Sequence, residues 1–122
     1  FDNKSAGFYA NHHTLALDFI NNTAFSNGVN YNMAGIAPDG SLIPLGNLFN
    51  NIAYKGRLTV NTEGLDMAHN SWTLPTPVTD ADFEDVSDAG WDAPRQSDGS
   101  LPVLRSFHLR PGSRLAGMGA FH

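Results

Sequence analysis

Short stretches in which apolar residues alternate with other residues recur along the first part of the chain. Each stretch runs into asparagine and ends in an aromatic residue. The pattern occupies residues 15–25, 47–54 and, in a shorter form, 69–72. In the first copy the alternating apolar positions run from Leu15 to Phe19. Alternation with a period of two is typical of β-strands, whose successive side chains point to opposite faces. We therefore expect three short strands that each end at a bend.

The asparagines stand at equivalent places in the three copies. Asn51 follows Asn22 by 29 residues, and Asn70 follows Asn51 by 19 residues. Asparagine tolerates unusual backbone angles and hydrogen-bonds locally, so it suits a bend. If the copies stack at the spacing of neighbouring strands, about 4.8 Å, the three amides can bond one another in a ladder. The pattern predicts a structural role for these residues.

A repeat of short strands at intervals of 20–30 residues favours a parallel β-solenoid. A β-sandwich would need hairpin turns between consecutive strands, and Asn27-Gly28 is the one good candidate. Each coil of a solenoid buries its apolar face only against its neighbours, so at least three coils are needed. This chain has barely three, which favours the end of a longer solenoid.

The pattern changes after Trp72, where Pro75-Thr-Pro77 interrupts it. Residues 79–83 read as a capping box that opens a short helix, with Phe83 and Val86 on its buried face. A polar loop and a last strand over 103–109 would follow. We expect a single domain in which residues 1–74 form solenoid coils and residues 75–122 form a loop-rich capping tail.

Composition limits the possible partners. The chain has 122 residues, a net charge of −5 and scattered lysines and arginines, which disfavours a nucleic-acid surface. It has no cysteine, and no apolar run is long enough for a membrane span. The acidic residues between Asp80 and Asp88 lack the spacing of an EF-hand loop. Helix capping and a solvated face are the favoured interpretation of this acidic group.

Residues 1–14 are polar and rich in turn formers, and we expect them to form a loop beside the first coil. The loop contains residues whose side chains suit contacts with a ligand: Asn3, Lys4, Tyr9, Asn11, His12 and His13. Adjacent histidines on an extended chain point to opposite faces, so His12 and His13 are unsuited to bind one metal ion together. Each candidate also has a plain structural alternative, either packing of the loop or solvation.

Several of these stretches together resemble the pectate lyases of polysaccharide lyase family nine. The resemblance extends over nearly the whole chain. It is carried by Phe1-Asp-Asn, Phe19-Ile-Asn-Asn-Thr-Ala-Phe25, Asn27-Gly-Val-Asn-Tyr31, Leu48-Phe-Asn-Asn-Ile-Ala-Tyr54, Asn70-Ser-Trp72, Asp80-Ala-Asp-Phe83, Asp98-Gly-Ser-Leu-Pro102 and Leu109-Arg-Pro-Gly-Ser113. The stretch between Asp2 and Leu17 is longer than is usual in pectate lyases and resembles the branch associated with rhamnogalacturonan.

The resemblance implies an all-β fold, the C-terminal coils of a right-handed parallel β-helix. It implies a parent protein that cleaves uronic-acid polysaccharide by β-elimination. In the family, calcium held by aspartates acidifies the sugar proton and a lysine removes it. Those residues would precede Phe1, so we carry no catalytic residue over to this chain and expect the isolated chain to be inactive.

The resemblance further implies a bacterial protein that is secreted, periplasmic or on the cell surface, monomeric at full length, with the pectin backbone as its partner. Two alternatives remain open at this point. One is a non-catalytic β-helical module that binds carbohydrate or lies on a surface. The weaker one is a structural stalk, which the non-repeating tail after Pro75 disfavours.

Overall fold

The computed structural model describes residues 1–10, 15–33, 39–41, 46–60 and 65–121. The chain divides into two compact units, one formed by Phe1–Pro77 with Gly117–His122 and the other by Val78–Ala116. The first unit contains all the described strands. The second contains a single 3-10 turn, η1 (Asp80–Asp82).

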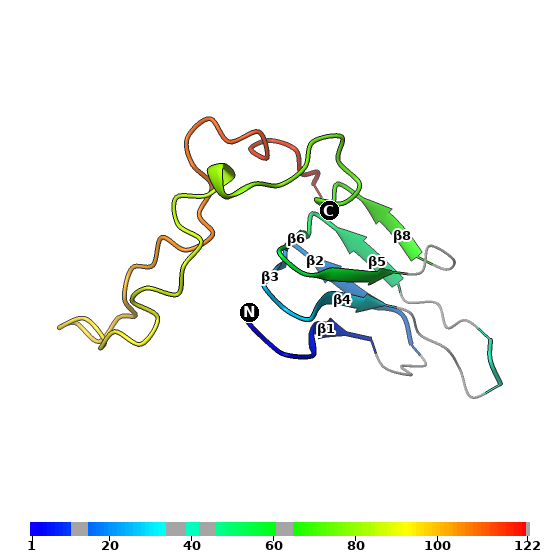
Figure 1. Ribbon diagram of the computed structural model, residues 1–122, viewed down its shortest axis with the longest axis horizontal. Helices are drawn as coiled ribbons and strands as arrows, with labels where there is room; N and C mark the ends of the chain where they lie inside the picture. Colours follow the sequence, from blue (N-terminus) through cyan, green and yellow to red (C-terminus); the bar gives the residue numbers. More distant parts are fainter. Residues whose placement is uncertain (11–14, 34–38, 42–45, 61–64, 122) are drawn as a thin grey trace. The chain divides into compact units, whose positions relative to one another are not determined.

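Parallel strands from successive coils build three narrow sheets (Figure 1). The first sheet has the order β1 (Ala6–Tyr9), β4 (Val29–Met33), β7 (Arg57–Val60). The second has the order β2 (Leu17–Ile20), β5 (Gly46–Phe49), β8 (Leu65–Ala68). The third pairs β3 (Thr23–Phe25) with β6 (Ile52–Tyr54). Every pairing between these strands is parallel and joins residues of successive coils. The predicted all-β parallel β-helix is therefore confirmed.

The corners between sheets are formed by single residues in the left-handed region of the backbone. Asn21, Asn50 and His69 follow the three strands of the second sheet, with φ of 59°, 57° and 56°. Ser26 and Lys55 follow the two strands of the third sheet, with φ of 55° and 48°. Such values are uncommon outside glycine, and asparagine adopts them most readily. The recurring asparagines mark these corners, although the bend itself lies one residue before Asn22.

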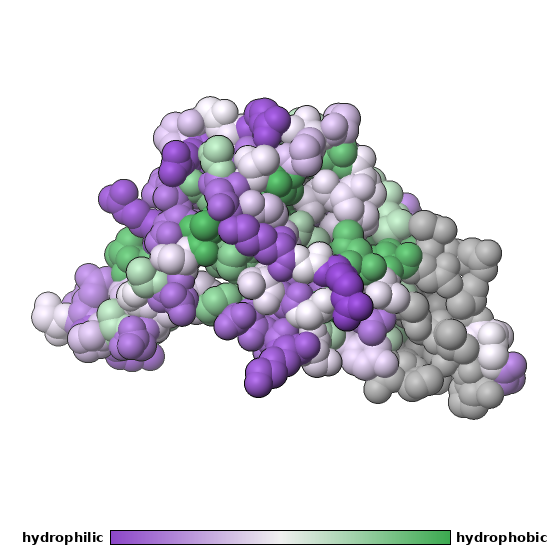
Figure 2. Space-filling view, viewed as in Figure 1, coloured by the Kyte–Doolittle hydropathy of each residue, from purple (hydrophilic) through white to green (hydrophobic). Residues whose placement is uncertain are grey.

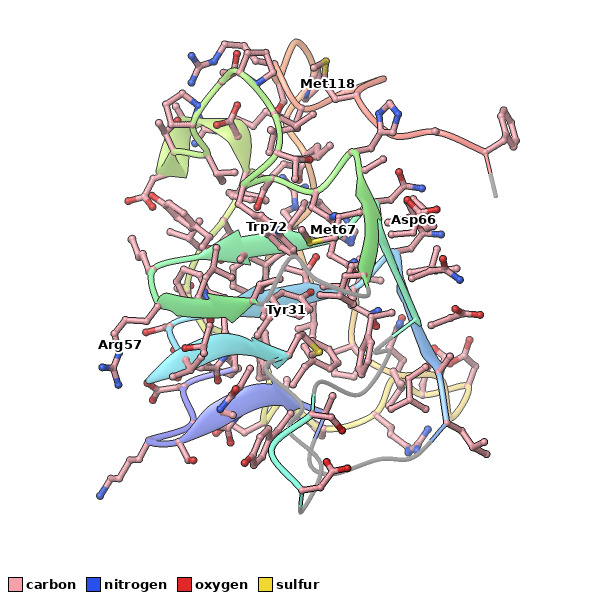
Figure 3. The ribbon with its side chains drawn as sticks, turned by 90° about the vertical axis from the view of Figure 1, so that its right-hand side faces the viewer. Tyr31, Arg57, Asp66, Met67, Trp72 and Met118 are labelled. Carbon is pink, nitrogen blue, oxygen red and sulfur yellow. The ribbon has the colours of Figure 1, made fainter. Side chains whose placement is uncertain are left out.

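The interior of the first unit is filled from all three sheets. Tyr31, Met33 and Leu48 are fully buried, and Trp72 packs against this cluster. Tyr31 lies between two other aromatic rings, with ring centroids 5.0 Å from Phe8 and 5.1 Å from Trp72. Figure 3 shows Tyr31 and Trp72 between the strands. Each such buried side chain contributes about 1.5–3 kcal/mol, which explains why short strands suffice.

The prediction of a loop over residues 1–14 is wrong for part of that segment. Ala6–Tyr9 is strand β1, which pairs with β4 so that Phe8 lies opposite Tyr31. Gly7 allows the close approach, because a Cβ there would lie 2.6 Å from Nδ2 of Asn27. The polar composition of the segment hid a strand that contributes one inward aromatic residue.

Two predictions for the tail also need correction. The expected last strand over 103–109 is absent from the described structure, which has isolated bridges from Phe83 to Leu109 and from Asp85 to Ser106. The expected helix is shortened to η1, which is preceded by the predicted capping box at Thr79. Phe83 is buried and Val86 is half-buried. With few neighbouring strands, this segment pairs only at single residues.

The alternation predicts that Leu15 faces the same side of a strand as Leu17 and Phe19. Leu15 lies before β2, however, and its side chain is 69% exposed. Leu17 and Phe19 do pack against the buried cluster. The alternation therefore locates the inward face only where the backbone is paired as a strand.

Candidate functional site

The three predicted ladder asparagines form one hydrogen-bonded column. The backbone N–H and Nδ2 of Asn22 both donate to Oδ1 of Asn51, at 3.0 and 3.2 Å. Asn51 repeats this arrangement with Oδ1 of Asn70, at 3.0 and 2.9 Å. The remaining Nδ2 hydrogens reach backbone carbonyls, so Asn51 donates to Phe19 and Asn70 donates to Leu48. Satisfied, buried amides of this kind specify the alignment of the coils.

A second amide column, which the sequence patterns did not reveal, lies at another corner. The backbone N–H and Nδ2 of Asn3 both donate to Oδ1 of Asn27, at 2.9 Å each. Asn27 in turn donates from Nδ2 to Oδ1 of Asn30 at 3.0 Å, and Asn30 donates to the Tyr54 carbonyl. Asn3 and Asn27 each follow a residue with positive φ, Asp2 and Ser26, just as Asn22 follows Asn21.

The structure places the candidate ligand-binding residues in different surroundings. The amide of Asn3 belongs to the second column, and Lys4 is exposed in the bend that follows. Tyr9 lies on β1 with 55% of its surface exposed. Asn11, His12 and His13 lie outside the described residues. Asn3, Lys4 and Tyr9 thus share one strand and its approach, at the first sheet.

The outer face of the first sheet carries polar side chains in register. Phe8 and Tyr31 point inward, so their neighbours Tyr9, Asn32 and Thr59 point outward as one row. We call these three residues the polar row. An aromatic ring, an amide and a hydroxyl are groups that contact sugars through stacking and hydrogen bonds.

Cations gather where the strands of this sheet begin. Lys4 precedes β1, Lys55 directly follows β6, and Arg57 is the first residue of β7. We call this group the basic corner. Nε of Arg57 donates to the Gly28 carbonyl at 3.2 Å, and Nζ of Lys55 lies 5.6 and 5.3 Å from the ring centroids of Phe25 and Tyr54. The basic corner contains every lysine and arginine between residues 1 and 77.

The outer face of the second sheet carries the opposite charge. Asp18, Asn47 and Asp66 are in register across β2, β5 and β8. Figure 3 shows Arg57 and Asp66 on opposite sides of the unit. On the face seen in Figure 2, hydrophilic residues are interspersed with small hydrophobic groups. The first unit therefore carries its positive and negative charges on different sides, although the net charge of the whole chain is negative.

The described residues do not fit a calcium site. No group of three His, Asp or Glu side chains suited to a metal ion occurs among them. The set most similar to a calcium site consists of Asp18, Asn47 and Asp66. Within this set, Nδ2 of Asn47 donates a hydrogen bond to Oδ1 of Asp18 at 2.7 Å. An N–H donor directed at this oxygen competes with a cation for it.

Asp82, from the acidic group of the tail, is buried and serves the second unit. Burial raises its pKa, but hydrogen bonds from Thr79 and Ser113 and the charge of Arg114 outweigh this effect and hold the pKa below its ordinary value. Oδ2 accepts the backbone N–H of Thr79 at 2.8 Å, and Oδ1 accepts the Ser113 hydroxyl at 3.1 Å. This carboxylate is a structural anchor, in line with the capping interpretation.

Comparison with known proteins shows which proteins this chain resembles. The chain is 32% identical to pectate lyase L of Dickeya chrysanthemi and 30% identical to pectate lyase L of Dickeya dadantii, over 120 residues each. These matches cover 98% of this chain and 27% of either relative. A crystal structure of pectate lyase Pel9A superposes with a TM-score of 0.79 at 27% identity, over 97% of this chain and 28% of that one. No family model matches the chain.

The chain is thus a pectate lyase-like parallel β-helix. More particularly, the resemblance to polysaccharide lyases of family nine is confirmed by the two pectate lyase L relatives and by Pel9A. The chain spans about a quarter of the length of these relatives, which fits the predicted C-terminal portion of such a fold. No described helix is long and apolar enough to cross a membrane.

Proposed function

We propose that this chain is the C-terminal part of a bacterial protein that cleaves the uronic-acid backbone of pectin by β-elimination. The observation that carries the proposal is the match of nearly the whole chain to pectate lyases in both sequence and fold. In this proposal the substrate is homogalacturonan or rhamnogalacturonan, and the parent is a monomer exported to the periplasm, the cell surface or the medium.

The catalytic base and the calcium ligands belong, in this proposal, to coils that precede Phe1. The hydrogen bonds of the described carboxylates support this division. Asp18 and Asp82 accept hydrogen bonds from N–H and O–H groups, which occupy oxygens that a calcium ion would need. The part played by this chain is to contact the polysaccharide. The residues assigned to that contact are Asn3, Lys4, Tyr9, Asn11, His12 and His13.

A turnover assay tests the division of labour. The 122-residue chain is incubated with polygalacturonate and with rhamnogalacturonan, with and without calcium, and the ultraviolet absorbance of the unsaturated product is followed. We expect no turnover by this chain and calcium-dependent turnover by the same chain extended through its natural upstream coils. Turnover by the short chain would place the base inside it and overturn the division.

The extended chain also separates the enzyme from a non-catalytic carbohydrate-binding module. We expect its upstream coils to contain a lysine and several aspartates whose replacement abolishes turnover. An extended chain that folds and binds pectin, but turns over neither polymer at any calcium concentration, would contradict the proposed lyase function and favour the binding module.

A further inference from the structure

The second unit contains an arm, residues 84–108, in which the chain runs out and then returns beside itself. The chain turns where the N–H of Gln96 donates to the Ser100 carbonyl at 2.9 Å. Before the turn, Nε1 of Trp91 donates to the Ser106 hydroxyl at 2.8 Å, which joins the outgoing segment to the returning one. Figure 1 shows the two segments of the arm together, from yellow-green to orange.

The returning segment of the arm exposes its apolar side chains. Along residues 101–106 the exposed positions alternate with half-buried ones. Leu101 is 66% exposed and Val103 is 83% exposed. Leu104 points the other way, because its Cδ2 lies 3.7 Å from the place that a Cβ on Gly90 of the outgoing segment would occupy. An extended chain alternates in this manner when one of its faces is turned towards a neighbour.

The two outward side chains are of a kind that folded proteins bury. Leucine and valine are among the residues most often found fully buried, although a single exposed one is ordinary. Here two of them share one face of an extended segment, and Leu104 with Ser106 already takes the inner face. We call Leu101 and Val103 the apolar strip. The arm itself therefore offers no further place in which the apolar strip could be buried.

The size of the apolar strip favours an occupant that belongs to the same polypeptide. Two side chains expose far less than the roughly 800 Å² that each partner buries in a stable complex. A second copy of the chain would also have to overcome the loss of translational and rotational freedom on association. A segment of the same polypeptide avoids most of that cost, because the linkage keeps it at a high effective concentration. The chain spans 27% of its pectate lyase relatives, so a parent of that size would supply further coils.

We propose that the arm docks onto coils that precede Phe1, and that Leu101 and Val103 are buried there against an apolar outward row of those coils. In a solenoid each coil contacts only its neighbours. The docked arm adds a contact between parts of the β-helix that are several coils apart, and so ties the end of the solenoid to its earlier coils. This inference rests on the proposed function, which supplies the upstream coils.

The experiment measures how fast a thiol placed on the apolar strip reacts. The chain has no cysteine, so Val103→Cys is made in the 122-residue chain and in the same chain extended through its natural upstream coils. Labelling by a maleimide is followed by the mass of the peptide that contains the position. We expect labelling at least about tenfold slower in the extended chain, because a buried thiol reacts only during local opening.

Asp98→Cys, at the exposed tip of the arm, is the matched control and should react at the same rate in both chains. Within the extended chain alone, Val103→Cys should react at least about tenfold more slowly than Asp98→Cys. This second comparison keeps the test valid if the short variant unfolds.

Leu101→Ser tests whether the apolar strip causes the protection. Combined with Val103→Cys in the extended chain, it removes the neighbouring apolar side chain and should speed labelling at least about fivefold. Ser100→Ala alters an exposed residue outside the apolar strip and should leave the labelling rate unchanged. If Leu101→Ser also left it unchanged, the apolar strip would not be the docking surface.

Three further outcomes would overturn the proposal. Equally fast labelling of Val103→Cys in both chains would show that the upstream coils do not cover the arm. Slow labelling in both chains would show that these 122 residues cover it already. Protection that disappears on dilution would assign the apolar strip to a second copy of the chain. The turnover assay decides the lyase function separately, because an extended chain can protect the arm without turnover, or turn over pectin while the arm stays exposed.

Discussion

The two units of this chain reach an ordered structure by different means. In Phe1–Pro77 with Gly117–His122, parallel strands repeat in register and two columns of asparagine amides pass hydrogen bonds from coil to coil. In Val78–Ala116, one short turn and two isolated bridges surround a single buried carboxylate, Asp82. The first unit repeats the same contacts from coil to coil, and the second has no such repeat and packs a few apolar side chains, among them Phe83 and Leu115, near its one buried carboxylate.

The difference shows in which kind of polar group each unit buries. Asparagine amides are neutral, so Asn51 and Asn70 can be buried without the cost of a desolvated charge. Asp82 is an ionised group, and its burial is compensated by Thr79, Ser113 and Arg114. The first unit should therefore respond to the loss of a ladder amide, and the second should respond to pH.

The largest effect is expected for Asn51→Leu. Asn51 is 1% exposed and connects three coils. Leucine would remove the acceptor of both Asn22 donors and the side-chain donor to the Phe19 carbonyl, while the backbone N–H at position 51 could still donate to Asn70. We expect a loss of about 3–5 kcal/mol of unfolding free energy in the first unit, since each unsatisfied buried group costs about 1–3 kcal/mol. Urea unfolding followed by far-ultraviolet circular dichroism measures it.

Asn47→Leu is the control for this variant, because Asn47 lies on the outer face of β5 in the same coil and its side chain donates to the exposed carboxylate of Asp18. It should change the unfolding free energy by less than about 1 kcal/mol. An Asn51→Leu protein with the wild-type midpoint would show that the amide column does not hold the coils together.

An intermediate effect is expected when the protein is acidified, and it should be a loss of amide protection in the second unit. The pKa of Asp82 lies below its ordinary value, as do those of the exposed Asp85 and Asp98, which accept hydrogen bonds from Ser87 and Ser100. A depressed folded-state pKa stabilises the fold above the unfolded pKa, about 4, and that contribution is lost as the pH falls through the folded value. We expect amide protection in Val78–Ala116 to fall below about pH 4.

Hydrogen exchange read out by segment distinguishes the units in this experiment. Protection at the amide columns of the first unit should persist to lower pH, because their asparagines do not titrate. Asp82→Asn should reduce protection of the second unit at neutral pH and flatten its pH dependence. If both units of the wild type lost protection at the same pH, Asp82 would not be the anchor of the second unit.

The smallest effect is expected for Tyr31→Phe. The Tyr31 hydroxyl donates to the Asn22 carbonyl at 3.0 Å, and burial raises the pKa of this hydroxyl well above its ordinary value. The ring stacking with Phe8 is kept in phenylalanine, so only the hydrogen bond is lost, which costs about 1 kcal/mol. Thermal unfolding measures the change, and the exposed Tyr9→Phe serves as the matched control. If Tyr31→Phe lost more stability than Asn51→Leu, the Tyr31 hydroxyl would matter more to the fold than the amide column, contrary to this ranking.

The parts of the fold that repeat were predictable from the sequence. The alternation in residues 15–25 and 47–54 and the recurrence of Asn22, Asn51 and Asn70 indicated parallel coils, and the Thr79 capping box indicated η1. Strand β1 was not predictable, because the segment around Phe8 has one inward aromatic residue and no asparagine copy at the usual interval. Strand pairing depends on a neighbour from another coil, which no local pattern contains.

The candidate site was predicted less completely. The composition of residues 1–14 indicated Asn3, Lys4 and Tyr9 as ligand contacts, and this assignment remains a prediction. The column of Asn3 with Asn27 and Asn30 was missed, since Asn3 belongs to a different coil from Asn27 and Asn30 and lies 24 positions before Asn27. The same reason hid the basic corner, because Lys4 and Arg57 look like isolated cations until the register of β1, β4 and β7 is known.

By itself, the sequence determined that short strands recur and that asparagines stand beside their bends, and it showed the resemblance to pectate lyases. The strands and the bends depend on local backbone preference and on the alternation of side chains, which neighbouring residues contain. Only the tertiary structure decided which strands pair, which amides share a column and which side chains share a face. Those properties depend on register between coils about 20–30 residues apart, and a shift of one residue would turn every inward side chain outward.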